Sequence, residues 1–146
     1  MTVNHSGYSD EYLASILKNV KTIALVGASA KPERASHEVM MYLQENGYRV
    51  IPVNPGLVGT ELLGETVYGS MLDVPGDVDM VEVFRRSEKV AGVCDEALEI
   101  KTKVVWMQIG VTDIDAARRL EREGIKVVMD RCPKQDIPRL RSMGLL

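Results

Sequence analysis

Short apolar runs alternate with amphipathic segments along most of this chain. The runs Ile23–Val26, Val50–Val53, Val104–Met107 and Ile125–Met129 are nearly continuous in apolar residues, which is typical of strands buried on both faces. A further strand is predicted over 78–84, although Asp79 and Glu82 interrupt its apolar character. Helical spacing of apolar residues follows or precedes each strand. This alternation predicts a parallel sheet between two layers of helices.

Residues that favour helix ends mark where the predicted helices begin and end. Ser9 and Ser87 are predicted to cap helices at their N-termini, and Thr112-x-x-Asp115 resembles a capping box with Asp in place of Glu. Gly47 and Gly124 stand where left-handed caps end helices. The segment 57–75 contains turn residues, a predicted short edge strand at 66–68 and a helical turn at 70–72. Another helical turn is predicted at 133–140.

These elements predict a single α/β domain over residues 1–146, with a Rossmann-like open parallel sheet and helices on both faces. In such folds ligands bind beyond the carboxyl ends of the strands, where the strand order reverses. The candidate binding rim therefore consists of residues 27–36, 54–56, 84–87, 108–112 and 130–133.

Composition narrows the class of partner. The net charge is −3 and no block of basic residues occurs, which weighs against a nucleic-acid partner. No apolar run reaches the roughly 18–20 residues of a membrane span, and the first ten residues lack the pattern of a signal peptide. Cys94 and Cys132 form no zinc-binding cluster, so a cytoplasmic protein with reduced cysteines is expected.

The turn after the first strand is the first candidate for an anion site. Gly27, Ala28 and Ser29 follow the strand, and Ser36 begins an amphipathic helix. Free backbone N–H groups and a helix N-terminus would converge there on a phosphate. The turn lacks the full Gly-x-Gly-x-x-Gly fingerprint of dinucleotide binding, because Ser29 stands at the second glycine position. Such a turn can also be a simple tight connection with no ligand.

The end of the second strand argues against a nicotinamide dinucleotide. NAD-binding domains carry Asp or Glu there to hold the ribose 2′-hydroxyl. This chain has Val53-Asn54-Pro55 instead, with no carboxylate. An ADP group that carries an additional phosphate at another position would not be repelled by this end of the strand.

Basic side chains on the rim could meet that phosphate. Lys31 and Arg34 follow the first turn, and Arg85 and Arg86 follow a predicted buried strand. Arginine can grip phosphate in a bidentate manner. The alternative is that Lys31 and Arg34 are solvated loop residues, and that one of the arginine pair meets a carboxylate such as Glu88.

The sequence specifies no reaction. His37 and Cys132 are the plausible titratable groups on the rim, and a surface histidine is the favoured interpretation of His37. His5 is expected in a flexible leader. Trp106 and Cys94 are expected in the core rather than in a site. Serine-hydrolase and Walker A motifs are absent.

Taken together, the rim segments resemble small stand-alone CoA-binding proteins, which are similar to the CoA-binding domain of the succinyl-CoA synthetase α subunit. The resemblance covers about residues 12–140. It rests on these ordered blocks: Val26-Gly27-Ala28-Ser29, Pro32-x-Arg34-x-Ser36, Val53-Asn54-Pro55, Val83-Phe84-Arg85-Arg86-Ser87, Val105-Trp106-Met107-Gln108-Ile109-Gly110 and Asp130-Arg131-Cys132.

The resemblance implies a role for each block. Gly27, Ala28 and Ser29, with Lys31, Arg34 and Ser36, would hold the phosphates of the ADP part. Val53, Asn54 and Pro55 would border the adenine and its ribose. Phe84, Arg85 and Arg86, with Gln108, Ile109 and Gly110, would line the pantetheine path. Leu57 departs from the synthetase, which has a lysine just after its Pro-Gly turn. The second domain of the synthetase, with its phosphorylated histidine, has no counterpart in a chain of this length, so ligase activity is not implied.

Three hypotheses follow. The leading one is a protein that binds coenzyme A or an acyl-CoA and has no ligase activity of its own. The second is a small oxidoreductase or transferase that uses a nucleotide cofactor. The third is a regulatory subunit that reports CoA status to a protein partner.

Overall fold

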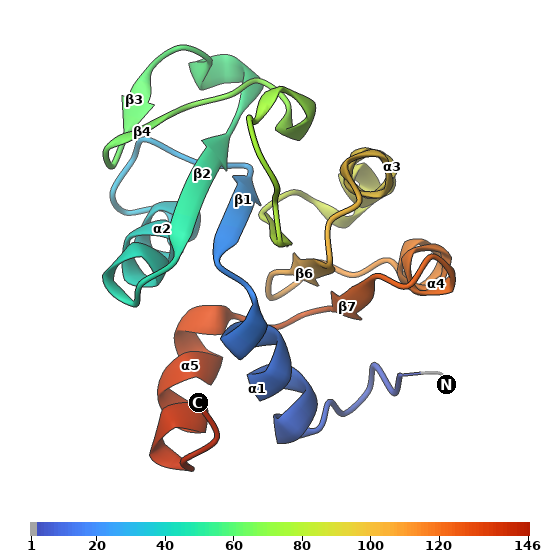
Figure 1. Cartoon of the computed structure of the whole chain (residues 1–146). Coiled ribbons are helices and arrows are strands. Elements are labelled where there is room, and N and C mark those ends of the chain that lie inside the picture. Colours follow the sequence, from blue (N-terminus) through green and yellow to red (C-terminus); the bar gives the residue numbers. More distant parts are fainter. Residues whose placement is uncertain (1–2) are drawn as a thin grey trace.

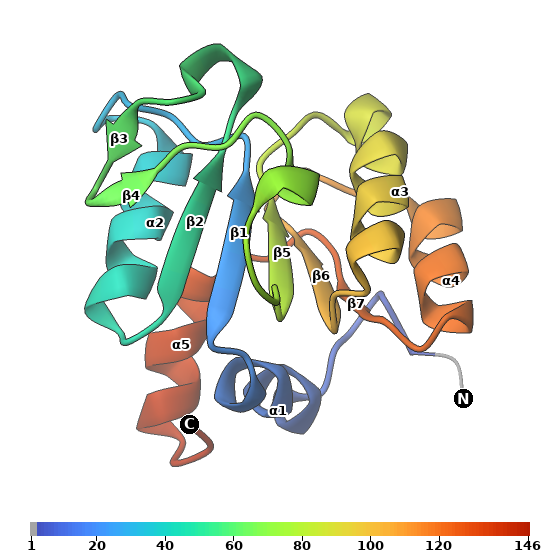
Figure 2. The same ribbon diagram turned by 45° about the horizontal axis from the view of Figure 1, so that its top comes forward.

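The computed structural model describes residues 3–146 and has a five-stranded parallel sheet at its centre (Figures 1 and 2). The strands are β1 (Thr22–Val26), β2 (Arg49–Val53), β5 (Met80–Val83), β6 (Val104–Met107) and β7 (Lys126–Val128). Their order in the sheet is β2-β1-β5-β6-β7. The chain therefore leaves β1 for β2 on one side and continues from β5 to β7 on the other. The order reverses between β1 and β5, as the Rossmann-like prediction requires.

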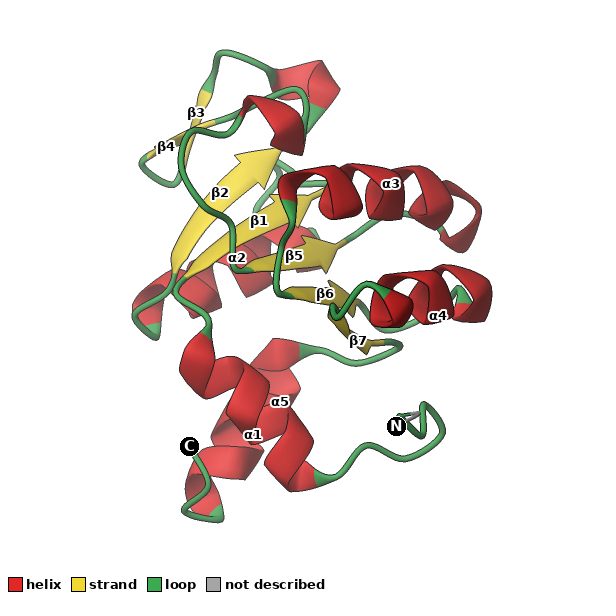
Figure 3. Cartoon of the chain, turned by 45° about the vertical axis from the view of Figure 1, so that its right-hand side comes forward, coloured by secondary structure: helices red, strands yellow, loops and turns green. Residues whose placement is uncertain are grey.

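Helices cover both faces of this sheet (Figure 3). On one face lie α1 (Asp10–Asn19), α2 (Ala35–Glu45) and α5 (Pro133–Ser142). On the other lie α3 (Val90–Ile100) and α4 (Ile114–Arg122). A hairpin of β3 (Glu61–Leu62) and β4 (Glu65–Thr66) stands beside β2. Within residues 3–146, no helix has both the length and the apolar character needed to cross a bilayer.

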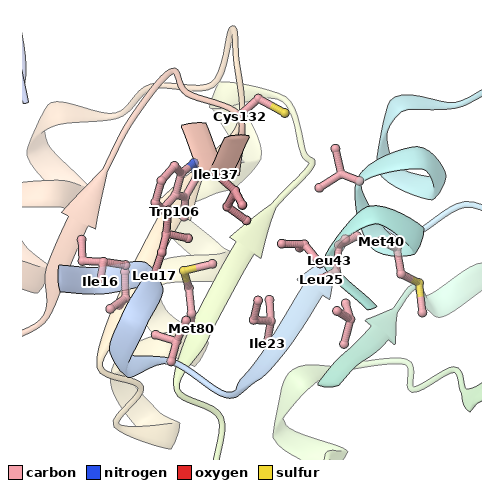
Figure 4. Packing of buried hydrophobic residues seen from close by; sticks show 14 of the residues in the cluster. Ile16, Leu17, Ile23, Leu25, Met40, Leu43, Met80, Trp106, Cys132 and Ile137 are labelled. Atoms are coloured by element: carbon pink, nitrogen blue, oxygen red, sulfur yellow. The ribbon is translucent and has the colours of Figure 1, made fainter. Parts of the chain in front are cut away.

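Alternate residues of each strand serve two separate cores, because successive side chains of a strand point to opposite faces. Ile23 and Leu25 pack with α1, α2 and α5, whereas Ala24 and Val26 pack with α3 and α4. Figure 4 shows Trp106 of β6 and Ile137 of α5 in the first of these clusters. The expected core positions of Trp106 and Cys94 are confirmed, since both are fully buried. The indole Nε1 of Trp106 donates to the Arg131 carbonyl at 2.9 Å.

Of the three predicted N-terminal caps, one is confirmed and two are wrong, whereas the predicted left-handed conformation of Gly47 and Gly124 after α2 and α4 is confirmed. Ser9 caps α1 by accepting a hydrogen bond from the Tyr12 amide. Asp113 caps α4 through the Ala116 amide, so the predicted capping box at Thr112 is wrong. Ser87 begins a single 3-10 turn instead of capping α3, and its hydroxyl accepts from the Thr112 amide at 3.1 Å. Ser87 thus joins the loop after β5 to the loop after β6.

Two further predictions of local structure need correction. The edge strand predicted at 66–68 is divided: β4 ends at Thr66, and Tyr68 makes an isolated parallel bridge to Val53. The segment from Pro133 is a ten-residue helix, α5, and not a single turn. It buries Ile137 and Leu140 against the sheet. The predicted turn at 70–72 is present as a 3-10 helix at Met71–Asp73, capped by Ser70.

The end of β1 requires glycine. Gly27 has a φ of +95°, and a Cβ at this position would lie 2.2 Å from the Phe84 carbonyl oxygen. The Gly27 amide donates to the Val53 carbonyl, and the Phe84 amide donates to the Val26 carbonyl. The ends of β1, β2 and β5 therefore meet at one point, where only a residue without a side chain fits.

This geometry predicts different costs for two glycine substitutions. Gly27→Ala is expected to lower the free energy of unfolding by ~3 kcal/mol or more, because backbone strain and a backbone clash combine. Gly64→Ala is the matched control, since Gly64 has a φ of +84° and a Cβ there would meet nothing within 4 Å. It is expected to cost about 1 kcal/mol. Urea denaturation of both variants measures the difference, and equal costs would contradict the close contact with Phe84.

Candidate functional site

A hollow of about 570 Å³ lies at the carboxyl ends of β1, β2 and β5. The turn after β1 forms one wall, the N-terminus of α2 a second, and the turn after β2 a third. Phe84, which follows β5, completes the lining. The lining residues are Gly27, Ala28, Ser29, Ala30, Lys31, Arg34, Ala35, Ser36, Asn54, Gly56, Leu57 and Phe84.

A second hollow of about 630 Å³ adjoins the first. It lies between α2, the loop after β6 and the first turn of α5. Its lining residues are Ala35, Glu38, Val39, Phe84, Gln108, Ile109, Val111, Cys132, Lys134 and Gln135. Ala35 and Phe84 line both hollows. The two therefore form one groove along the carboxyl edge of the sheet, which we call the carboxyl-edge groove.

The turn after β1 does not offer all of its amides to a ligand, contrary to the sequence prediction. The Gly27 and Ala28 amides both donate to the Val53 carbonyl, at 2.9 and 3.3 Å, and Ala28 is buried. These two N–H groups hold β1 and β2 together. The Ser29 hydroxyl accepts from the Lys31 amide at 3.1 Å, which shapes the turn further.

Other amides at the groove remain available. The Ser29 and Ala30 amides, and those of Ala35 and Ser36 in the first turn of α2, have no hydrogen-bond partner in the part of the chain that the structure describes. The helix dipole adds partial positive charge at this end of α2. An anion in the first hollow would therefore meet the next part of the turn and the helix start, rather than the glycine itself.

Asn54 has a structural role at the end of β2. Its side-chain nitrogen donates to the Ala28 carbonyl at 2.7 Å, and its side-chain oxygen accepts from the Gly56 amide at 2.8 Å. The amide thus joins the turns after β1 and β2. An aspartate could not donate to the Ala28 carbonyl. This bond gives a physical reason for the absence of a carboxylate here.

The structure brings many of the predicted site residues together. Those that line the groove are Gly27, Ala28, Ser29, Lys31, Arg34, Ser36, Asn54, Phe84, Gln108 and Ile109. Val53, Pro55, Arg85, Arg86 and Gly110 line neither hollow. Arg86 is almost fully exposed and lies 3.8 Å from Glu88, the carboxylate named in the alternative interpretation of the arginine pair.

Several lining residues were missed by the sequence analysis. Glu38 and Val39 face the groove from α2, and their helical spacing from Ala35 of the predicted rim could have placed them on the same side of that helix. Lys134 and Gln135 come from the first turn of α5, which was predicted only as a short turn. Their position depends on how α5 returns to the sheet.

Charges in the two hollows differ. Lys31 and Arg34 are exposed, line the first hollow and form no ion pair within residues 3–146. In the second hollow, Lys134 of α5 lies 3.8 Å from Glu38 of α2. The first hollow therefore has two cations without a carboxylate partner, whereas the second hollow has a neutralised pair and is otherwise lined largely by uncharged residues.

Both histidine predictions require correction. His37 is buried and lines neither hollow, so it is not a surface histidine. Its Nδ1 has no hydrogen-bond partner among the described residues. His5 is not in a loose leader: it bonds the Tyr8 hydroxyl at 2.6 Å and lies 3.1 Å from a Glu121 oxygen. Neither imidazole is presented to the groove.

A buried carboxyl lies in the central strand. Glu82 of β5 is fully buried, and neither of its oxygens has a hydrogen-bond partner within residues 3–146. Burial raises the pKa of the Glu82 carboxyl well above its usual range, and the Cys132 sulfur adds to this shift. Burial therefore favours the neutral form of the Glu82 carboxyl.

Among residues 3–146, no group of three or more His, Cys, Asp or Glu side chains is placed to hold a metal ion.

The Arg131 guanidinium is held by two hydrogen bonds to the Asp136 carboxylate, at 2.9 and 2.6 Å. This basic rim residue therefore has a structural partner.

Comparison with known proteins assigns a family to this arrangement. A family described as "CoA binding domain" matches residues 21–138, which include β1 to β7 and both hollows. The chain belongs to this CoA-binding domain family. The match agrees with the resemblance drawn from the rim segments alone.

Relatives fall into two groups. The uncharacterized protein YneT of Bacillus subtilis is 42% identical over 122 residues, which cover 84% of this chain and 89% of YneT. Subunit alpha of the ADP-forming acetate–CoA ligase I of Pyrococcus furiosus is 37% identical over 93 residues, covering 61% of this chain but only 20% of that subunit. Similarity thus extends to whole small proteins and to one part of larger ligases.

A solved structure agrees with the fold along almost the whole chain. A hypothetical protein from Pyrococcus horikoshii superposes with a TM-score of 0.88 at 38% identity. The superposition covers 97% of this chain and 98% of that one.

The buried carboxyl predicts an unusual pH dependence of stability. The folded-state pKa of Glu82 lies above its unfolded value, so its contribution to stability is complete below pH about 4.5 and is lost as the pH rises toward the folded pKa. Glu82→Gln should remove this loss, which amounts to at most about 1.4 kcal/mol per pH unit. Urea denaturation of both proteins between pH 4 and 9 measures the slopes. If the free energy of unfolding changes with pH by the same amount in both proteins, Glu82 titrates as an ordinary glutamate.

Proposed function

We propose that this protein binds coenzyme A or an acyl-CoA in the carboxyl-edge groove and has no ligase activity of its own. The observation that carries the proposal is the division of the groove into a cationic hollow and an adjoining hollow of largely uncharged lining. Coenzyme A has the same division, because a highly charged nucleotide end is joined to a long, uncharged pantetheine arm. Membership of the CoA-binding domain family supports this choice of ligand.

The first hollow suits the phosphates. Lys31 and Arg34 provide positive charge without a competing carboxylate. The amides of Ser29 and Ala30 and the start of α2 provide donors. Arginine and helix N-termini are recurrent phosphate ligands, since each offers several directed N–H groups. We place the ADP part here, with Asn54 bordering the nucleoside, whereas Val53 and Pro55 lie behind the lining.

The second hollow suits the pantetheine arm. Val39, Ile109 and Val111 provide apolar walls, and Gln108 has a buried side-chain oxygen with no hydrogen-bond partner within residues 3–146. A buried carbonyl of this kind can accept a hydrogen bond from an amide N–H of the arm. Phe84 stands at the junction of the hollows. The arm would then run toward Cys132, with Arg85, Arg86 and Gly110 outside the contact.

The absence of ligase activity is proposed from the groove itself. Neither histidine lines either hollow, so no imidazole is placed to carry a phosphoryl group beside the ligand. The ligase relatives match this chain over only a small part of their own length.

We also propose a cytoplasmic location, because both cysteines are free and buried.

Calorimetric titration tests the proposed ligand. We expect saturable binding of CoA and acetyl-CoA, and no comparable binding of NAD, because the ribose-binding carboxylate of NAD-binding domains is replaced by Asn54. Binding of NAD without binding of CoA would exclude the proposal.

Two arginine substitutions locate the phosphates. Arg34→Ala is expected to weaken CoA binding by about 1–3 kcal/mol, because it removes a cation from the first hollow. Arg86→Ala is the matched control: its side chain is 86% exposed and lines neither hollow, so the dissociation constant should not change. An equal effect of both variants would mean that the loss arises from overall charge and not from contact.

Enzymatic activity remains a second candidate because of Cys132. This cysteine lines the second hollow and not the first, and the residue is only 6% exposed. A catalytic thiol must be accessible to react. Enzymatic activity as the second candidate function therefore depends on whether small molecules in the groove can reach the Cys132 sulfur.

Thiol labelling separates the two candidates. We expect iodoacetamide to modify Cys132 more slowly than a free cysteine peptide, because the side chain is buried, and we expect CoA to slow the reaction further. Mass spectrometry of the peptide containing Cys132 measures the rate, and Cys132→Ser identifies the modified residue. Labelling faster than the free peptide would favour the enzyme.

A further inference from the structure

We propose that a second ligand site, for a small amphipathic carboxylate, lies at the amino edge of the sheet, opposite the carboxyl-edge groove. A hollow of about 840 Å³ is present there. It is larger than either hollow of the groove, and it shares no lining residue with them. We call it the amino-edge hollow. This proposal is independent of CoA binding.

The amino-edge hollow arises from the way the helices end. One wall is the second half of α1, with Ile16, and the C-cap residue Val20 that follows it. The opposite wall is formed where α3 leads into β6 and where α4 leads into β7. Both connections are short left-handed turns, at Lys101 and at Gly124. Because both turns are short, the ends of α3 and α4 border the hollow across from α1.

The interior of the amino-edge hollow is apolar. Ile16, Val20, Val104 and Ile125 are core residues that also line it, and Leu98 is half-buried beside them. A chain of methylene groups placed against these side chains would be removed from water, which favours binding in proportion to the apolar area buried. The interior therefore favours an aliphatic tail.

Positive charge gathers at the same hollow, although the whole chain has a net charge of −3. Lys101, Lys103, Lys126 and Arg119 line it, against one carboxylate, Glu123. Lys103 lies 3.4 Å from Asp79, and Arg119 lies 2.7 Å from Asp95, outside the hollow. Lys101 and Lys126 have no acidic partner within residues 3–146. These two ammonium groups can therefore bind an anion without first breaking an existing ion pair.

Arg119 is already engaged by α3. Its two terminal nitrogens contact Asp95 and the Ala91 carbonyl, and its Nε is buried. Lys101 and Lys126 are therefore the lining cations that can meet an anionic head group at the mouth of the hollow. An apolar interior with a cationic mouth fits a single carboxylate on a short aliphatic chain.

Titration with octanoate tests the site. We expect saturable binding by calorimetry, with decanoate binding about tenfold more tightly, because two more methylenes are buried. Octylamine, which has the same tail and the opposite charge, should not bind comparably. The absence of saturable octanoate binding, or equal binding of octylamine, would overturn the proposal.

Charge-reversal variants of the lining lysines test whether octanoate binds in the amino-edge hollow. Lys101→Glu combined with Lys126→Glu should weaken octanoate binding at least tenfold. The control combines Lys89→Glu with Arg118→Glu, two exposed cations that do not line the hollow, and changes the net charge equally. All four side chains are exposed, so both variants are expected to fold. Equal weakening by the two variants would overturn the placement.

Competition with CoA separates this site from the groove. Saturating CoA should leave the octanoate affinity unchanged, since the two hollows lie at opposite edges of the sheet. Displacement of octanoate by CoA would show that the fatty acid enters the carboxyl-edge groove and would overturn the proposal. Octanoate binding by a protein that fails to bind CoA would reject the proposed function alone and leave this inference standing.

Discussion

The close contact between Gly27 and Phe84 is the constraint on which the carboxyl-edge groove depends. The backbone of Gly27 passes so near the Phe84 carbonyl that a side chain would overlap it. Hydrogen bonds from Gly27 to Val53 and from Phe84 to Val26 join the ends of β2, β1 and β5 at this point. Since these strands lie on both sides of the reversal in strand order, the contact sets where the loops diverge and the first hollow forms.

The same contact changes the role of the glycine turn. In a dinucleotide fingerprint, glycine brings free amides close to a pyrophosphate. Here the Gly27 and Ala28 amides bind the Val53 carbonyl instead, and Asn54 returns a second bond to the Ala28 carbonyl. The turn is thereby rigid, and the donors for an anion move onward to Ser29 and the start of α2. The turn therefore differs from the dinucleotide fingerprint in which of its amides remain free.

Buried polar groups connect the fold with the chemistry of the groove. Glu82, His37 and Gln108 are all buried, and each has an oxygen or nitrogen without a partner in the described part of the chain. Such groups are costly in a folded protein and are uncommon away from functional sites. Of these three residues, Gln108 lines the groove, whereas His37 and Glu82 line neither hollow. Gln108 is therefore the member of this set whose unpaired atom belongs to the groove.

The sequence by itself determined the order and type of the five strands of the parallel sheet and of helices α1 to α4, because apolar periodicity reflects local geometry and burial on one or two faces. It also determined that the turn after β1 and the residues near Lys31 and Arg34 belong to a common edge, since parallel strands end together. Only the tertiary structure decided which donors are free at that edge. It also decided that Ser87 binds another loop instead of capping α3, that His37 is buried, and that α5 contributes Lys134 to the groove. These outcomes depend on contacts between segments far apart in the chain, and no local pattern of residue types records which distant partner a polar group will meet.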